Sequence, residues 1–315
     1  MRLGIDLGGT KIEIIALADD GTIMRRERRA TPAGDYSATV ALIAQMVHET
    51  DQGLGVQASV GVGIPGSPSQ RSGTIRNANS TALNGRPLVS DLEQAIGRAV
   101  RVANDANCFA LSEATDGAAA GLASVFGVIL GTGVGGGLVL NGHGLSGLNG
   151  IAGEWGHNPL PAPLDDERPG PRCYCGRSGC IETWLCGPGF AADYVRQGGR
   201  QSLTAAQIIT RMRAGEALAV RCFDRYVERM ARALAGVINV FDPHAIVLGG
   251  GMSNIDELYD RVPGAWQAHI FSDHVATPLL RNRHGDSSGV RGAAWLWPPQ
   301  SAAPPHGQPT GSPAA

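Results

Sequence analysis

The chain has 315 residues, of which 43% are hydrophobic and 17% charged, a composition typical of a globular protein with room for two domains. The formal net charge of −2 excludes the strongly basic surface of a nucleic-acid-binding protein. No apolar run reaches the ~18 residues that span a bilayer. The first residues enter a strand pattern without the apolar segment of a signal peptide. We therefore expect a cytoplasmic protein with no nucleic-acid or membrane partner.

The first part of the chain alternates between strand and helix patterns. Apolar runs joined by tight turns, including Asp20-Gly21, indicate a β-hairpin at the start of the chain. Hydrophobic periodicity then predicts helices and buried strands in alternation, which favours an α/β fold. The expected strands cover residues 3–7, 12–17, about 22 onward, 59–64 and 99–103, and the expected helices cover about 36–49, 89–96 and 106–120.

The pattern restarts near residue 125. A strand, a glycine-rich turn and a second strand repeat the opening in order and type, which predicts the internal duplication of one α/β domain. The expected elements are strands over 125–130, 138–140 and 245–248, a turn over 131–137, and helices over 204–214, 218–240 and from about 288.

The duplication predicts where the domains divide. An N-terminal domain is expected over residues 1–118 and a C-terminal domain over 119–297, with the last helix able to pack back on the N-terminal domain. Residues 298–315 consist largely of Pro, Ala, Gly and Ser with almost nothing to bury, so we expect a disordered tail.

The turn Asp6-Leu7-Gly8-Gly9-Thr10-Lys11 is a candidate phosphate site between two strands. Gly8 and Gly9 allow backbone N–H groups to turn towards a phosphate, and Thr10 adds a hydroxyl donor. Asp6 could hold Mg²⁺ through a carboxylate oxygen. An ordinary tight hairpin is the alternative interpretation.

Two further glycine clusters are candidate nucleotide contacts. Residues 131–136 match G-x-G-x-x-G, but a strand follows instead of a helix, which excludes a dinucleotide fold and favours a second phosphate-facing hairpin. Gly249-Gly250-Gly251 follows an apolar strand and opens a helical stretch, where adenosine or a phosphate could lie on the helix N-terminus. A plain strand-to-helix turn is the alternative.

Asp105 is the candidate general base. It follows the strand over 99–103 within Asn104-Asp105-Ala106-Asn107, so its carboxylate is expected at a strand end. A sugar hydroxyl is a poor nucleophile, and a positioned carboxylate takes its proton as it attacks the γ-phosphorus. A role as a helix N-cap is the alternative, and the two roles are compatible.

One histidine and three clustered cysteines form a candidate metal site. His157, Cys173, Cys175 and Cys180 make a Cys₃His set, and four protein ligands leave no open position, as in a structural zinc centre. Glu154 and Glu182 flank these ligands and could accept hydrogen bonds from sugar hydroxyls. The alternatives are unliganded cysteines and surface carboxylates.

The motifs together resemble those of the ROK-family sugar kinases. The resemblance covers nearly all of residues 1–297 and rests on the phosphate loop, the Asn-Asp-Ala-Asn stretch, the glycine-rich segment 128–153, Glu-x-Gly-His and the Cys-x-Cys-Gly-x-x-Gly-Cys-x-Glu segment. Segments 77–81, 153–161 and 284–292 look like those of bacterial fructokinases, some of which also accept mannose. The spacer from His157 to Cys173 is longer than in many relatives.

The resemblance implies a pair of actin/hexokinase-like (ribonuclease H-like) domains with ATP and Mg²⁺ in the cleft between them, and a homodimer. It implies that Asp105 is the base and that a fructokinase forms fructose 6-phosphate, with glucose, mannose or an N-acetylhexosamine as alternative substrates. The implied sugar contacts are Asn79, Asn104, Asp105, Glu154, His157 and Glu182. The implied nucleotide contacts are Asp6, Gly8, Gly9, Thr10, Lys11, Gly131, Thr132, Gly133, Gly249, Gly250 and Gly251.

Two other classes of function share parts of this pattern. A ROK-type sugar-sensing repressor carries a DNA-binding motif before the sugar domain, whereas the first strand here is expected from Leu3 and the charge is not basic. An ATPase of the actin or heat-shock type shares the nucleotide fold, and the zinc segment with its two glutamates argues against it.

Overall fold

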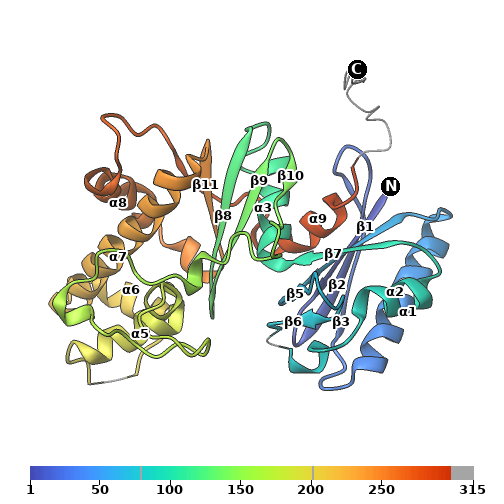
Figure 1. Ribbon diagram of the computed structural model, residues 1–315, viewed down its shortest axis with the longest axis horizontal. Coiled ribbons are helices and arrows are strands. Elements are labelled where there is room, and N and C mark those ends of the chain that lie inside the picture. The colour runs from blue at the N-terminus through green and yellow to red at the C-terminus, as the bar shows by residue number, and fades with distance from the viewer. Residues whose placement is uncertain (79, 201, 299–315) are drawn as a thin grey trace, which may run out of the picture.

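The computed structural model describes residues 1–78, 80–200 and 202–298, with the Asp286 side chain left out. Two five-stranded sheets lie side by side along its long axis (Figure 1). The first has the order β3-β2-β1-β4-β7 and the second the order β10-β9-β8-β11-β12. In both, an antiparallel meander continues into parallel strands. The strands of the first sheet are β1 Arg2–Leu7, β2 Lys11–Leu17, β3 Ile23–Ala30, β4 Ser59–Ile64 and β7 Val100–Asn104. Those of the second are β8 Ser124–Leu130, β9 Val134–Leu140, β10 His143–Gly144, β11 Ala245–Gly249 and β12 Leu279–Arg281, and β5 Ser67–Pro68 pairs with β6 Ile75–Arg76.

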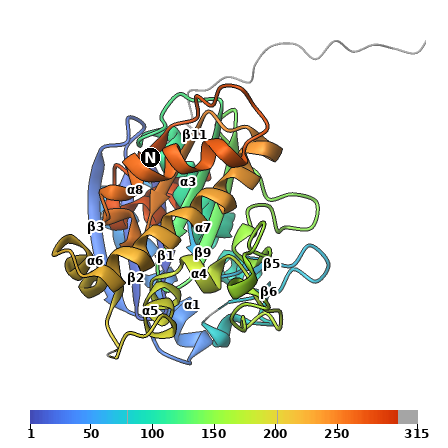
Figure 2. The ribbon, with the colours of Figure 1, turned by 90° about the vertical axis from the view of Figure 1, so that its left-hand side faces the viewer.

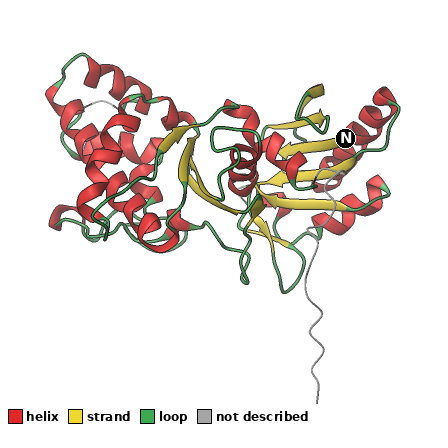
Figure 3. Ribbon diagram, turned by 90° about the horizontal axis from the view of Figure 1, so that it is seen from above, coloured by secondary structure: helices red, strands yellow, loops and turns green. Residues whose placement is uncertain are grey.

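Helices cover the two sheets and fill the space between them. A group of helices gathers at the end of the molecule beyond the second sheet, as Figures 2 and 3 show. They are α4 Glu182–Leu185, α5 Gly187–Arg196, α6 Ala205–Arg213, α7 Ala217–Phe241 and α8 Glu257–Trp266. Helices α1 Tyr36–Leu54 and α2 Leu88–Ile96 lie on the first sheet, and α3 Asp105–Thr115 and α9 Ser288–Trp295 lie between the sheets. The predicted duplicated α/β fold is confirmed. No helix among the residues described is long and apolar enough to cross a membrane.

Helix α9 packs closely on the first sheet and on α3, although it comes last in the chain. A Cβ atom at Gly61 would lie 1.8 Å from the Ala293 carbonyl oxygen, and one at Gly292 would lie 1.6 Å from the Cys108 carbonyl oxygen. Glycine is therefore required at both contacts, because a larger residue would force the elements apart. Beyond the helix, the Trp297 indole donates to the Val60 carbonyl oxygen at 2.7 Å.

A buried carboxylate fixes α3 against the end of the chain. Glu113 is fully buried and accepts from the Ser288 hydroxyl at 2.7 Å and from the backbone N–H of Arg283 at 3.0 Å. It also accepts from the Ala118 N–H at 2.8 Å. These bonds satisfy a buried charge. They also hold in place the helix whose first residue is Asp105.

Several local predictions are corrected by the structure. Strand β9 begins at Val134 within the predicted glycine turn, because Gly135, Gly136 and Gly137 pair with β8 as strand residues. Helix α3 ends at Thr115, short of the predicted residue 120, and the Ala118 N–H is bound by the Glu113 side chain instead. Helices α4 and α5 and strand β12 were not predicted at all. The helical stretch expected after Gly251 consists of a 3₁₀ helix over Gly251–Asn254 and then α8. The predicted tail over 298–315 lies outside the described residues apart from residue 298.

Candidate active site

Asp105 lies at the junction of β7 and α3, where the sequence placed it. The N-cap of α3 is Asn104, whose side-chain oxygen accepts from the Ala106 N–H at 2.9 Å and whose amide donates to the Gly66 carbonyl oxygen at 3.2 Å. The capping role therefore falls mainly on Asn104, which leaves Asp105 able to serve a ligand, although its Oδ1 also accepts from the Ala106 N–H at 2.7 Å.

The electrostatic environment of Asp105 favours the action of its carboxylate as a proton acceptor. Water reaches its carboxylate, but protein atoms surround it on most sides, and this burial raises its pKa above the ordinary value. The charge of Glu154 raises the pKa further, while the hydrogen bond from Ala106 opposes the shift. A carboxylate with a raised pKa is a better general base near neutral pH.

Asp6 is a second carboxylate near Asp105. Burial, and then the charges of Asp105 and Glu13, raise its pKa to about 6, against the opposing charges of Lys11 and Arg28. Two carboxylates that repel each other in a partly buried place provide the donor oxygens and the charge that Mg²⁺ prefers. Asp6 therefore fits the predicted magnesium ligand.

The hairpin between β1 and β2 is a compact turn. The Gly8 N–H donates to the Lys11 carbonyl oxygen at 3.0 Å, and the Thr31 hydroxyl donates to the Gly8 carbonyl oxygen at 2.8 Å. The N–H of Gly8 is thus used inside the turn, whereas Gly9, Thr10 and Lys11 are exposed. These three residues therefore expose the groups that the sequence analysis assigned to a phosphate.

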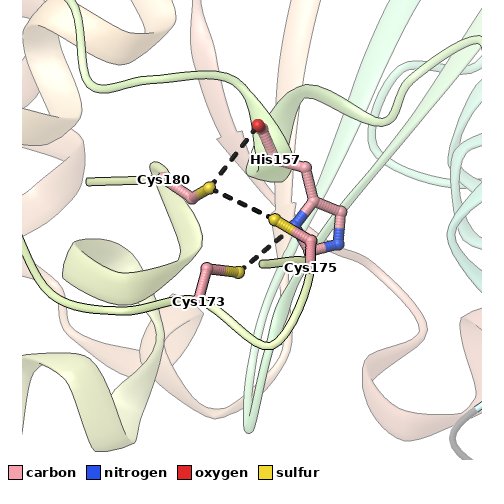
Figure 4. Close-up of side chains that lie close together, drawn as sticks. All are labelled: His157, Cys173, Cys175 and Cys180. Atoms are coloured by element: carbon pink, nitrogen blue, oxygen red, sulfur yellow. Dashed lines mark hydrogen bonds between the residues drawn. The ribbon is translucent and has the colours of Figure 1, made fainter. Parts of the chain in front are cut away.

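His157 and the three cysteines converge on one point (Figure 4). The four ligand atoms all lie within 4.8 Å of one another, with Cys173 Sγ 3.6 Å from His157 Nδ1 and Cys175 Sγ 3.6 Å from Cys180 Sγ. Neighbouring ligands around a tetrahedral zinc lie about 3.5–3.8 Å apart, given Zn–S and Zn–N bonds of ~2.3 and ~2.0 Å. The donor set and its spacing therefore fit a structural zinc ion.

The metal loop is tied to the second glycine hairpin through Glu182. This residue opens α4, and its Oε2 accepts from the Val134 N–H at 3.0 Å. A Cβ atom at Gly133 would lie 2.7 Å from the same oxygen, so a larger residue there would displace the Glu182 carboxylate. Glu154 is exposed and precedes the short 3₁₀ helix Trp155–His157. Both glutamates therefore flank the Cys₃His cluster, as predicted. Asn79 lies outside the described residues.

A cavity of ≈ 750 Å³ lies beside the second sheet, where its parallel strand β11 ends. Of the predicted nucleotide residues, Gly131, Thr132 and Gly251 line it, whereas the first hairpin, Gly133, Gly249 and Gly250 do not. Apolar side chains form much of its wall, and the start of α5 faces it, a combination suited to a nucleoside and its phosphates. The other lining residues, which the sequence analysis missed, are Gly187, Pro188, Ala191, Thr204, Ala205, Ala206, Ile209, Thr210, Arg213, Met252, Asn254 and Ile255.

A buried ion network anchors the spacer between His157 and Cys173. Glu167 is 3% exposed and accepts from Arg229 Nε at 2.8 Å and from Arg232 Nη2 at 3.0 Å. Arg232 also donates to the carbonyl oxygens of Pro161 and Ala162. The long spacer is therefore held to α7 at both its beginning and its middle.

Arg229 extends this network to two other segments. Its Nη1 donates to the Asp193 carboxylate of α5 at 2.7 Å, and its guanidinium lies 4.3 Å from the ring centre of Trp184 in α4. The same side chain thus contacts the spacer, the helix that begins with Glu182 and the helix whose start lines the cavity. No sequence pattern indicates this connection.

Comparison with known proteins identifies the family. The ROK family model matches residues 2–300. An N-acetyl-D-glucosamine kinase of Vibrio cholerae is 44% identical over 300 residues, which cover 94% of this chain and 99% of that protein. The crystal structure of a ROK hexokinase from Thermus thermophilus is 32% identical, with a TM-score of 0.82, over 93% of this chain and 96% of that one. A ROK family glucokinase from Streptomyces griseus, solved with glucose and AMPPNP, is 28% identical with a TM-score of 0.74, over 94% and 98% of the two chains.

These matches confirm the resemblance to sugar kinases and correct one prediction. Several proteins that are 42–44% identical to this chain over about 300 residues are N-acetyl-D-glucosamine kinases. The prediction of a fructokinase is contradicted by these relatives. The segments that suggested it, such as 153–161 and 284–292, are short and do not by themselves define the sugar.

Proposed function

The chain belongs to the ROK family, and we propose that this sugar kinase transfers the γ-phosphoryl group of ATP to the 6-hydroxyl of N-acetyl-D-glucosamine. The names of the relatives with 42–44% identity support this sugar. Glucose is the second candidate, because the Streptomyces griseus relative was solved with glucose and AMPPNP.

The setting of Asp105 is the observation that carries the proposed chemistry. Its carboxylate stands at a strand end, its pKa is raised, and the capping of α3 rests mainly on Asn104. Asp105 accepts the proton of the sugar hydroxyl while that oxygen forms a bond to the γ-phosphorus. The bond from the γ-phosphorus to the bridging oxygen breaks, and ADP leaves with the electron pair.

The remaining residues bind and orient the two substrates. The cavity beside β11 takes the nucleoside, and Gly9, Thr10 and Lys11 present donors to its phosphates. Asp6 would hold Mg²⁺, which supplies positive charge to the phosphate oxygens. Asn104, Glu154, His157 and Glu182 bind sugar hydroxyls, and a zinc ion on the Cys₃His set would keep their loop in one conformation.

The proposal is tested by ATP consumption with Mg²⁺ in zinc-replete protein. The sugars compared are N-acetyl-D-glucosamine, N-acetyl-D-mannosamine, glucose, mannose and fructose. Highest kcat/KM with N-acetyl-D-glucosamine supports the proposal, and preference for another hexose leaves a sugar kinase with a different substrate. Sugar binding without turnover would instead support a sugar-sensing regulator, and ATP hydrolysis that ignores every sugar would support an ATPase.

Replacement of the base tests the mechanism separately. Asp105→Asn should lower kcat by at least 10²-fold, because general-base catalysis typically contributes ~10²–10⁴. Calorimetric Kd values for sugar and ATP should stay near those of the wild type. Asp35→Asn is the matched control, since Asp35 also stands at a helix N-terminus but caps α1. A kcat within threefold of the wild type in Asp105→Asn would show that Asp105 is not the base.

Three further features are part of the proposal. We expect a homodimer, which light scattering measures, and about one zinc per chain, which elemental analysis measures. We place the enzyme in the cytoplasm, where the thiols of the Cys₃His set stay reduced.

A further inference from the structure

His157 has one ring nitrogen for the metal cluster and one that faces away from it. Nδ1 lies 3.6 Å from Cys173 Sγ, on the side of the three sulfur atoms, and Figure 4 shows the second nitrogen pointing away from them. This second nitrogen, Nε2, is the atom left for a sugar hydroxyl. Each imidazole nitrogen makes one in-plane hydrogen bond, as either donor or acceptor.

In the structure this position is taken by a tyrosine. The Tyr174 hydroxyl lies 2.9 Å from His157 Nε2, and the two rings meet edge to face with centroids 5.1 Å apart. Tyr174 stands between two candidate metal ligands, in a turn closed by the bond from the Gly176 N–H to the Cys173 carbonyl oxygen at 3.0 Å. Its backbone is therefore held within that turn.

The side chain of Tyr174 is free to move although its backbone is held. It is 72% exposed, so rotation about its side-chain bonds sacrifices little packing. The Tyr174 hydroxyl can therefore leave His157 Nε2 while the turn keeps its conformation.

We propose that Tyr174 is a sugar-site residue whose hydroxyl occupies the position on His157 Nε2 that a sugar hydroxyl takes when the substrate binds. The phenol and the sugar compete for one nitrogen atom, so Tyr174 rotates away as the sugar enters. Sugar binding then replaces one hydrogen bond to His157 Nε2 with another. The free energy of binding is therefore smaller than it would be if Nε2 had no partner before the sugar arrived. This inference rests on the proposed function, in which His157 contacts the sugar.

The consequence is that removal of the competing hydroxyl strengthens sugar binding. Tyr174→Phe keeps the ring and deletes only the oxygen, so His157 Nε2 is released for the sugar. Because a neutral hydrogen bond contributes a modest net amount, the expected effect is a Kd about 2- to 10-fold lower. N-acetyl-D-glucosamine and glucose are titrated by calorimetry in the absence of ATP.

The matched control is Tyr36→Phe, which deletes a hydroxyl that bonds to the Asp91 carboxylate on the first domain. Its sugar Kd should equal that of the wild type. Zinc content and KM for ATP should be unchanged in both variants, which separates competition at His157 from damage to the metal loop. An unchanged or higher Kd for Tyr174→Phe overturns the proposal.

Failure of the proposed function gives a different result from failure of this inference. A wild-type protein that binds neither sugar and consumes no ATP with either refutes the function itself. A wild-type protein that binds one of them, with the same affinity in Tyr174→Phe, refutes only the role of Tyr174.

Discussion

Removal of the Glu167 charge should strongly destabilise the folded protein, although this residue lies outside the proposed catalytic site. Glu167→Gln keeps the shape of the side chain but removes its charge. Of the ion pairs described for the buried Arg229 and Arg232, 1% and 4% exposed, there then remain only that of Arg229 with Asp193 and that of Arg232 with the exposed Glu228. The four buried charges change from a sum of zero to +1. Breaking one member of a buried ion pair costs about 3–5 kcal/mol, because the other charge stays buried without compensation. We expect a loss of stability of this size, a large share of the ~5–15 kcal/mol that stabilises a typical domain.

The assay is urea unfolding followed by tryptophan fluorescence, since Trp184 lies against Arg229. Asp165→Asn is the matched control: it makes the same chemical change in the same spacer, but the Asp165 ion pair with Arg168 is fully exposed and should contribute nothing measurable. Zinc release to a colorimetric chelator should be faster in Glu167→Gln only, because Arg232 holds the start of the spacer while Glu167 holds its middle.

The network also predicts a pH dependence. Burial opposes the ionisation of Glu167, but hydrogen bonds from Arg229, the Leu164 N–H and Arg232 outweigh it and hold its pKa below the usual range. A lowered pKa in the folded state contributes stability that is present above the unfolded pKa of ~4.3 and is lost as the pH falls through the folded value. Glu167→Gln should therefore flatten the acid side of the stability profile. The reasoning is refuted if Glu167→Gln and Asp165→Asn unfold at the same urea concentration.

Two other predictions concern the substrate sites. The pKa of Asp6 is raised to about 6 in the folded protein, so the folded state loses stability as the pH rises from the unfolded value of ~3.9 to about 6. Asp6→Asn should therefore raise the melting temperature at pH 7.5 without Mg²⁺ but leave it unchanged at pH 4. An equal rise at both pH values would contradict this reasoning. Ala205→Phe should fill part of the cavity and raise KM for ATP at least tenfold while the sugar Kd stays constant. The control is Ala214→Phe, because Ala214 is exposed just beyond the end of the same helix. If the two variants have the same KM for ATP, the nucleotide does not bind in this cavity.

The parts of the fold that could be predicted are those recorded in local sequence. The strands over 59–64 and 245–249 are runs of β-branched and apolar residues, and the structure places them within a residue of the prediction. Helix α5 was missed because Gly187-Pro188-Gly189 reads as a turn, although Pro188 lies in its first turn and the Cys186 side chain caps it by accepting from the Gly189 N–H. Helix α8 carries Pro263 in its interior, which argues against a helix by pattern. In both, packing against α7 and its neighbours outweighs local preference.

The candidate site divides in the same way. The four metal ligands are visible in the sequence because three of them lie within eight residues and their chemistry is specific. The cavity is assembled from Gly131, α5, α6 and the turn that follows β11, which only the tertiary fold brings together. The run Asp165-Asp166-Glu167 reads as exposed charge in a spacer, yet its third member is buried between two arginines of α7. Pattern identifies which residues can bind a metal, but long-range ion pairs decide how firmly the loop is held. The side chains of the proposed sugar site, including His157 and Tyr174 in contact with each other, lie on or beside that loop, and discrimination between sugars depends on individual hydrogen bonds.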